Sequence, residues 1–208
     1  METFQDTEFQ TFIAYFLAAF YSVVALFYSV MIKIRGAKQC DATLVNMGQK
    51  HSLHWWNHLV FRVFRGAIWF MCVYHVFDPS IAQTLIPLTS LQYPIVHFTG
   101  AVMMLLGFTL AIYCNFILDT AWRSGIDNHS NPGLVTRLIY ARSRNPSYIG
   151  VATSQMGFFL AWPNVFSLVC LIVGLIALRI QIGLEEVFLN DMYNEEYQSY
   201  IQKVPRYF

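Results

Sequence analysis

The chain has 208 residues, of which 56% are hydrophobic and only 12% are charged. Soluble domains are about 45–50% apolar and about 25% charged, so a soluble globule of this length could not bury so much apolar surface. This composition excludes disordered chains, nucleic-acid-binding modules and most cytosolic enzymes, and a net charge of +1 provides no long-range field for a polyanion. The four cysteines lie far apart without metal-binding spacing, which indicates reduced thiols. We therefore expect a protein whose main solvent is the lipid bilayer.

The first three apolar segments each predict a membrane helix. Residues 12–32 contain 21 residues without a charge, and at 1.5 Å per residue they span about 30 Å, one bilayer core. The acidic residues before this run argue against a cleaved signal peptide. A second segment covers residues 60–77. The third covers residues 94–118, where Gly100 and Gly107 share a helix face and allow close packing.

The fourth and fifth apolar segments differ in length. Residues 148–161 span only about 21 Å of helix, which is less than the bilayer core. Either the helix extends back through residues 143–147, or its start is recessed and leaves a cup with a helix N-terminus at its floor. A turn at residues 162–164 leads to the fifth segment, residues 165–183. The tyrosines of residues 193–208 recur at helical spacing, which predicts an interfacial amphipathic helix.

The distribution of basic residues predicts the topology. With the N-terminus outside, twelve of the 13 basic residues fall in cytosolic segments or at cytosolic helix ends, as the positive-inside rule requires. Arg179 falls in the cytosolic half of the last helix. We expect an all-α, polytopic integral membrane protein with about five transmembrane helices and a cytosolic C-terminus, which forms a single domain over residues 1–208. Its location would be a bacterial inner membrane or the endoplasmic reticulum membrane of a eukaryote.

Two polar groups have both a functional and a plain interpretation. His51, His54 and His58 share a helix face, and imidazole suits iron and zinc. Such sites need more histidines from several helices, however, so we expect an interfacial helix and no metal. Glu185 and Glu186 follow the last apolar segment, and Arg179 lies seven residues before Glu186, which can place them in one groove. Charged groups at membrane depth are functional candidates, although a snorkelling arginine and a solvated helix end explain them too.

The stretch from residue 134 to residue 150 contains three arginines before a helix that starts at a proline. These arginines suit either an anionic or nucleotide-like ligand at a helix N-terminus or simple anchoring at the interface. The stretch resembles the signature L-V-T-x-G-P-Y-x-x-x-R-H-P-x-Y-x-G of the isoprenylcysteine carboxyl methyltransferase family. Residues 185–206 resemble its second signature, E-E-x-x-L…Y-x-x-Y-x-x-x-V-P-R. Two positions differ: Leu138-Ile139 replaces Gly-Pro, and Asn145 replaces histidine.

That family belongs to a broader group of membrane methyltransferases, which includes the phospholipid N-methyltransferases. The resemblance implies S-adenosylmethionine as cofactor, bound on the cytosolic side by residues 134–208, while residues 1–118 form the first three helices. The residues implied to bind the cofactor are Leu134, Val135, Tyr140, Arg144, Asn145, Tyr148, Glu185 and Glu186. Arg206 and Glu186 are the implied catalytic residues, with Arg206 near the methyl acceptor.

The implied reaction is methyl transfer to a lipophilic or prenylated acceptor in the bilayer. A carboxylate acceptor, as in isoprenylcysteine methyl esterification, needs only orientation, which Arg206 can provide. An amine acceptor, as in a phospholipid, must be neutral, and Glu186 would take its proton. Two other classes stay open. One is an NADPH-dependent sterol-type reductase, whose chains have a similar R-x-P-x-Y-x-G stretch but are longer. The other is a non-catalytic membrane protein with a decayed site, against which the intact glutamate pair argues.

Overall fold

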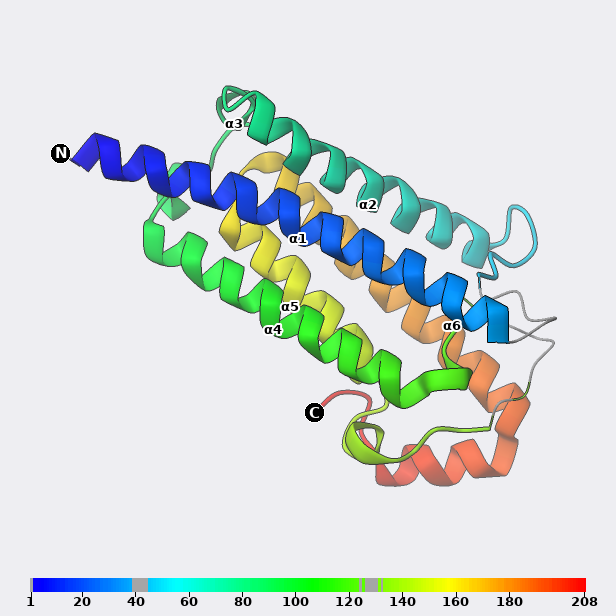
Figure 1. Cartoon of the computed structure of the whole chain (residues 1–208). Coiled ribbons are helices and arrows are strands. Elements are labelled where there is room, and N and C mark those ends of the chain that lie inside the picture. Colours follow the sequence, from blue (N-terminus) through cyan, green and yellow to red (C-terminus); the bar gives the residue numbers. More distant parts are fainter. Residues whose placement is uncertain (1, 39–44, 124, 126–130, 132) are drawn as a thin grey trace.

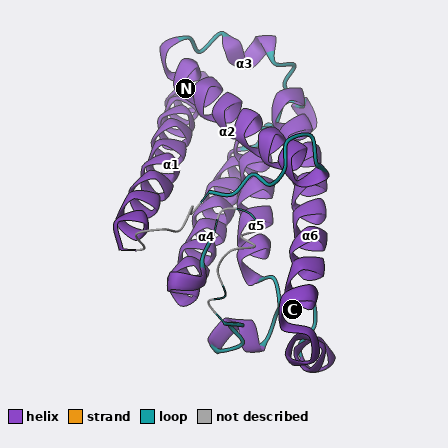
Figure 2. Ribbon diagram, turned by 90° about the vertical axis from the view of Figure 1, so that its right-hand side faces the viewer, coloured by secondary structure: helices purple, strands orange, loops and turns teal. Residues whose placement is uncertain are grey.

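The computed structural model describes residues 2–38, 45–123, 125, 131 and 133–208. The regular elements among these residues are all helices, and an isolated bridge joins Pro87 and Asn164. Five helices run side by side as a bundle, with α4 and α5 adjacent along their lengths (Figures 1 and 2). The elements are, in chain order, α1 (Glu2–Lys38), α2 (Leu53–Phe77), α3 (Ile81–Thr84), η1 (Thr89–Leu91), α4 (Pro94–Leu118), η2 (Asp119–Ala121), η3 (Leu138–Ala141), α5 (Pro146–Ala161) and α6 (Val165–Lys203).

Four of the bundle helices, α1, α2, α4 and α6, are long and apolar enough to cross a membrane. Helix α5 has only 16 residues and spans about 24 Å, less than the bilayer core of about 30 Å. It begins at Pro146, so the alternative in which this helix extends back to residue 143 does not occur. The predicted all-helical membrane fold is confirmed, and the chain is an integral membrane protein.

Large apolar side chains cover the outside of the bundle as well as its core. Leu26, Leu106 and Ile176 are each more than half exposed, although they lie in the middle of long helices. Soluble monomers rarely expose such continuous apolar surface, whereas lipid solvates it without cost. Inside the bundle, Leu17 and Phe158 are fully buried between α1 and α5. The bilayer therefore acts as the solvent for the outer faces.

The α4–α5 pair is packed backbone against backbone at four glycines. A Cβ atom placed on Gly157 would lie 2.6 Å from the carbonyl oxygen of Gly100 and 2.6 Å from the amide nitrogen of Met104. A Cβ atom on Gly150 would lie 2.6 Å from the carbonyl oxygen of Gly107. The small-residue face predicted on α4 is therefore confirmed, and α5 presents a matching face. This contact fixes the short helix in the bundle.

We expect Gly157→Ala to lower the free energy of unfolding by about 1–3 kcal/mol, because the atoms that crowd the new methyl group belong to the backbone and cannot rotate away. Gly66→Ala in α2 is the matched control. Its Cβ atom meets no heavy atom within 4 Å, and alanine favours a helix over glycine by about 1 kcal/mol. Unfolding of both variants in the same detergent measures the difference. Equal stability of the two variants would contradict close backbone contact.

Helix α6 continues well beyond the end predicted at residue 183. It runs to Lys203 and is interrupted only at Asn194, whose backbone is not helical (φ 40°, ψ −111°). The part after Asn194 turns and crosses the end of the bundle, where it is drawn in red near the C-terminus (Figure 1). This part is the predicted interfacial helix. Glu185 and Glu186 consequently lie inside a helix and not at its end.

The opposite end of the bundle is fixed by the turn between α5 and α6. The carbonyl oxygen of Pro163 accepts hydrogen bonds from the amide of Leu88 (3.0 Å) and the side chain of Gln92 (2.8 Å). Asn164 begins α6 with a reciprocal capping box to Ser167. With this end held, the other ends of α5 and α6 can bear a site of defined geometry.

Candidate functional site

A cavity of about 650 Å³ lies between the bundle helices and reaches the segment before α5. One part of its wall is rich in polar side chains, and we call these residues the polar head: Tyr140, Arg144, Asn145, Tyr148, Glu185 and Glu186. Another part is apolar, and we call these residues the apolar arm: Val24, Ile68, Phe108, Val151 and Val173. A single cavity is thus lined both by charged groups and by aliphatic and aromatic groups from five helices.

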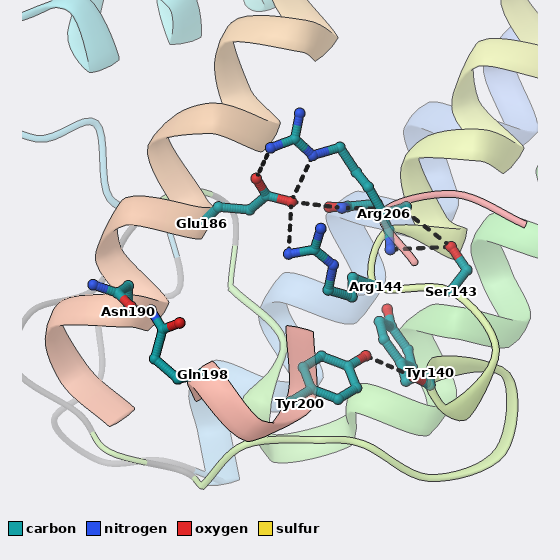
Figure 3. A network of polar contacts seen from close by, with 9 residues as sticks. Tyr140, Ser143, Arg144, Glu186, Asn190, Gln198, Tyr200 and Arg206 are labelled. Carbon is teal, nitrogen blue, oxygen red and sulfur yellow. Dashed lines mark hydrogen bonds and ion pairs between the residues drawn. The ribbon is translucent and has the colours of Figure 1, made fainter. Parts of the chain in front are cut away.

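Glu186 is the centre of a group of cationic and amide side chains (Figure 3). Arg206 donates from Nε to one carboxylate oxygen (3.0 Å) and from Nη2 to the other, so the contact has two prongs. Arg144 places Nη1 3.5 Å from Glu186, and Asn145 Nδ2 donates to it at 3.4 Å. The hydrogen bond to Glu186 raises the pKa of Arg206, so the guanidinium remains charged. One carboxylate therefore holds two arginines in place.

The segment after α6 is tied by its backbone to the segment before α5. The amide of Arg144 donates to the carbonyl oxygen of Pro205 (3.0 Å). The carbonyl oxygen of Arg206 accepts from Ser143 Oγ and from Asn145 Nδ2, each at 3.3 Å. Two stretches about 60 residues apart in sequence thereby meet, and these are the stretches that carry the two signatures. Residues 204–206 thereby lie against residues 143–145 and outside the cavity lining.

Glu185 has a different set of partners from its neighbour. The hydroxyl of Tyr148 donates to its Oε1 atom, and the Nε2 atom of Gln181 donates to the same oxygen at 3.1 Å. Gln181 in turn accepts a hydrogen bond from Asn57 of α2 at 3.2 Å. The two adjacent glutamates therefore lie in separate networks, one shared with the arginines and one with neutral donors.

The segment before α5 contributes apolar contacts and one strained residue. Leu134 packs against the cluster of Tyr197, Tyr200 and Val204, and Val135 packs beside Tyr140. Tyr200 donates to the carbonyl oxygen of Tyr140 at 2.6 Å, and burial raises the pKa of the Tyr140 hydroxyl, which stays neutral.

Leu138 replaces the glycine of the family signature and yet adopts a positive φ of 58°. This left-handed conformation costs a leucine about 1–2 kcal/mol. The turn that the family builds with glycine is therefore retained here at an energetic cost.

Several polar residues named from the sequence lie elsewhere. Arg179 is exposed and outside the cavity lining, so the groove expected between it and Glu186 is not formed and a snorkelling role fits. His51 lies in the turn before α2, with a φ of 65°, so it does not share the helix face of His54 and His58. The rings of His54 and His58 are in edge-to-face contact with centroids 4.7 Å apart.

The remaining sequence predictions concern metals and thiols. Among the described residues, no group of three or more histidine, cysteine or acidic side chains is placed to hold a metal ion. Cys72, Cys114 and Cys170 are buried free thiols, as expected. Cys40 lies outside the described residues.

Sequence reasoning missed two polar residues of this site. Asn57 and Gln181 are buried, with exposed fractions of 5% and 4%, and connect α2 to Glu185. The spacing of Gln181, four residues before Glu185 and hence on the same helix face, was an available signal. Nothing in the sequence around Asn57 indicates its partner, because that contact depends on how α2 packs against α6.

The comparisons with known proteins agree with this geometry. Residues 95–196 match the family model described as phospholipid methyltransferase. The match runs from α4 to just beyond the break in α6, so it includes every residue of the polar head and leaves out Asn57 and Arg206. No curated protein and no solved structure gives a significant match. With its helical membrane fold and both signature stretches joined at one cavity, the chain is a membrane methyltransferase that is similar to the phospholipid methyltransferases over residues 95–196.

Proposed function

We propose that the chain transfers a methyl group from S-adenosylmethionine, held at the polar head, to a carboxylate of a lipophilic acceptor that occupies the apolar arm. The observation that carries this proposal is the single cavity that joins the two. A water-soluble cofactor and a membrane-soluble acceptor need such a shared space, because the reacting atoms must come within contact distance.

The residues present fit this cofactor. The volume of about 650 Å³ lies within the range of about 300–1,000 Å³ that is usual for small-molecule sites. The carboxylates of Glu185 and Glu186 suit the ammonium and sulfonium groups. The buried Nε atom of Arg144 has no hydrogen-bond partner among the described residues, and it suits the carboxylate. When bound, S-adenosylmethionine supplies a methyl group activated by its positive sulfur.

The protein's own contribution is to orient the reactants and exclude water. Tyr197, Tyr200 and Val204 pack as a buried cluster, and Tyr197 and Tyr200 also line the cavity. A dry site of low dielectric strengthens every charged contact in it. Glu186 binds two of the guanidinium nitrogens of Arg206, and the third, Nη1, lies on the opposite side of the group, where it can orient an anionic acceptor (Figure 3).

An amine acceptor is the second candidate, since the matched family acts on phospholipids. An amine would have to lose a proton before it could attack, and Glu186 is the carboxylate in the group of arginines. That carboxylate is already occupied by Arg206 and Arg144, so an amine would have to displace an arginine to reach it. The geometry therefore favours a carboxylate acceptor.

Two measurements on the purified protein in detergent test the proposal. Calorimetry should show binding of S-adenosylmethionine and of S-adenosylhomocysteine but not of NADPH. Labelled methyl groups should then pass to a prenylated cysteine analogue. Binding of NADPH alone would support a reductase, and failure to bind any of the three would support a non-catalytic role. Transfer to a lipid extract but never to the analogue would identify the acceptor as a phospholipid.

We also propose that the N-terminus lies outside and that the polar head faces the cytosol. The support is the placement of the basic residues, and the loop from Asp78 to Tyr93 contains none of them. In a variant with Cys40 replaced by serine, a cysteine introduced at exposed Ser80 should react with an impermeant maleimide only from the outer side. Labelling of this cysteine only after the membrane is opened would reverse the orientation.

A further inference from the structure

A buried chain of hydrogen bonds connects α2 to the polar head. Asn57 Nδ2 donates to the backbone carbonyl oxygen of Ala177 (3.1 Å) and to the side-chain oxygen of Gln181 (3.2 Å). Gln181 Nε2 donates to Glu185 Oε1 (3.1 Å). With only 5% and 4% of Asn57 and Gln181 exposed, water has little access to replace these contacts. The chain therefore runs from a fixed backbone atom to a carboxylate at the cavity.

The chemistry of the two ends sets the direction of every bond between them. The carbonyl oxygen of Ala177 can only accept, so Asn57 must present its amide nitrogen there. The same nitrogen also faces Gln181, which must then present its oxygen. The other polar atom of the Gln181 amide is its nitrogen, which donates to Glu185. A reversed Gln181 would place its oxygen against the Glu185 carboxylate and its nitrogen against the Asn57 amide nitrogen, so neither hydrogen bond would form.

We propose that Asn57 is a positioning residue of the cofactor site, which acts through Gln181 to hold Glu185 in the orientation that receives the cofactor. The inference rests on the proposed function, because it takes Glu185 as a ligand of S-adenosylmethionine. It also assigns the N-terminal half of the chain a direct part in the site, since Asn57 lies outside residues 95–196 of the family match.

The alternative is that Asn57 only joins α2 to α6. If Asn57 has only a packing role, its substitution should affect stability whether or not Gln181 is present. If it has a positioning role, its effect on cofactor binding should require Gln181. The two therefore differ in how substitutions at residues 57 and 181 combine.

The experiment measures S-adenosylhomocysteine affinity by calorimetry in detergent for Asn57→Leu, for Gln181→Met and for the double variant. Leucine has nearly the shape of asparagine but cannot donate. We expect Asn57→Leu to weaken binding at least about tenfold, as when a buried hydrogen-bond network loses one member, and to have no further effect once Gln181 is methionine. Cys72→Ala, a buried change in α2 away from the cavity lining, should leave the affinity unchanged.

Wild-type affinity in Asn57→Leu would overturn the inference, and so would an equal loss in the presence and absence of Gln181. If the leucine variant does not fold, Asn57→Asp keeps the shape and removes the donations to Ala177 and Gln181, with the same expected loss and the same dependence on Gln181. Absence of binding by the wild-type protein would instead refute the proposed function, so the two failures are distinguishable.

Discussion

Replacing Glu186 with glutamine is expected to lower methyl transfer at least about a hundredfold, which corresponds to about 2.7 kcal/mol. Glutamine has the same shape but removes the negative charge that holds Arg206 and Arg144 together. The two guanidinium groups then repel each other, because the Glu186 side chain no longer carries the charge that pairs with both of them. We expect cofactor affinity to fall as well, by about 1–3 kcal/mol. Transfer of a labelled methyl group and calorimetry of the purified variant measure the two effects.

The matched control is Glu195→Gln, the same change on the exposed surface of α6 just beyond its break. It should leave both activity and affinity unchanged. If Glu186→Gln keeps its cofactor affinity, Glu186 is not part of the cofactor site. If it also keeps its activity, the group of arginines serves stability alone.

The second large effect is expected for Arg206→Lys, which should lower methyl transfer at least about tenfold while cofactor affinity barely changes. Lysine keeps the charge but has a single ammonium group, so it loses the planar two-pronged contact with Glu186 and the free Nη1 edge. A tenfold loss is about 1.4 kcal/mol of transition-state stabilisation. Steady-state kinetics with a prenylated cysteine analogue measure it.

Arg179→Lys provides the comparison, because Arg179 is exposed and lysine serves equally well as a snorkelling anchor. It should show wild-type rates. Full activity of Arg206→Lys would make Arg206 a second anchor of this kind. A parallel loss of cofactor affinity would instead place Arg206 in the cofactor site.

The sequence predicted the helices well where an apolar run had clear ends. The run at residues 94–118 coincides with α4, because Pro94 begins the helix and Asp119 follows its end. The prediction was wrong for the end of α6. It ended the helix at residue 183, because two acidic residues follow the apolar run. Those carboxylates are satisfied inside the helix by Tyr148, Gln181 and the arginines, and such partners cannot be read from local sequence.

The site was predicted by resemblance to signatures, which state the residue types and their spacing along the chain. Spacing brought Glu186 and Arg206 into the same proposal but assigned them separate ligands, whereas the structure pairs them with each other. Asn57 could not be predicted at all, because its contact with Gln181 depends on the docking of α2 against α6. Local pattern thus located the polar head, and only long-range packing showed how its members hold one another.

The contact of residues 204–206 with residues 143–145 has a consequence for the order of biosynthesis. Residues 204–206 follow all five bundle helices in the chain, so Glu186 lacks its two-pronged partner until this segment has been synthesised. The Glu186–Arg206 pair therefore forms only when the segment has folded back onto residues 143–145. A chain released after Lys203 would contain all five bundle helices and yet leave Glu186 without Arg206.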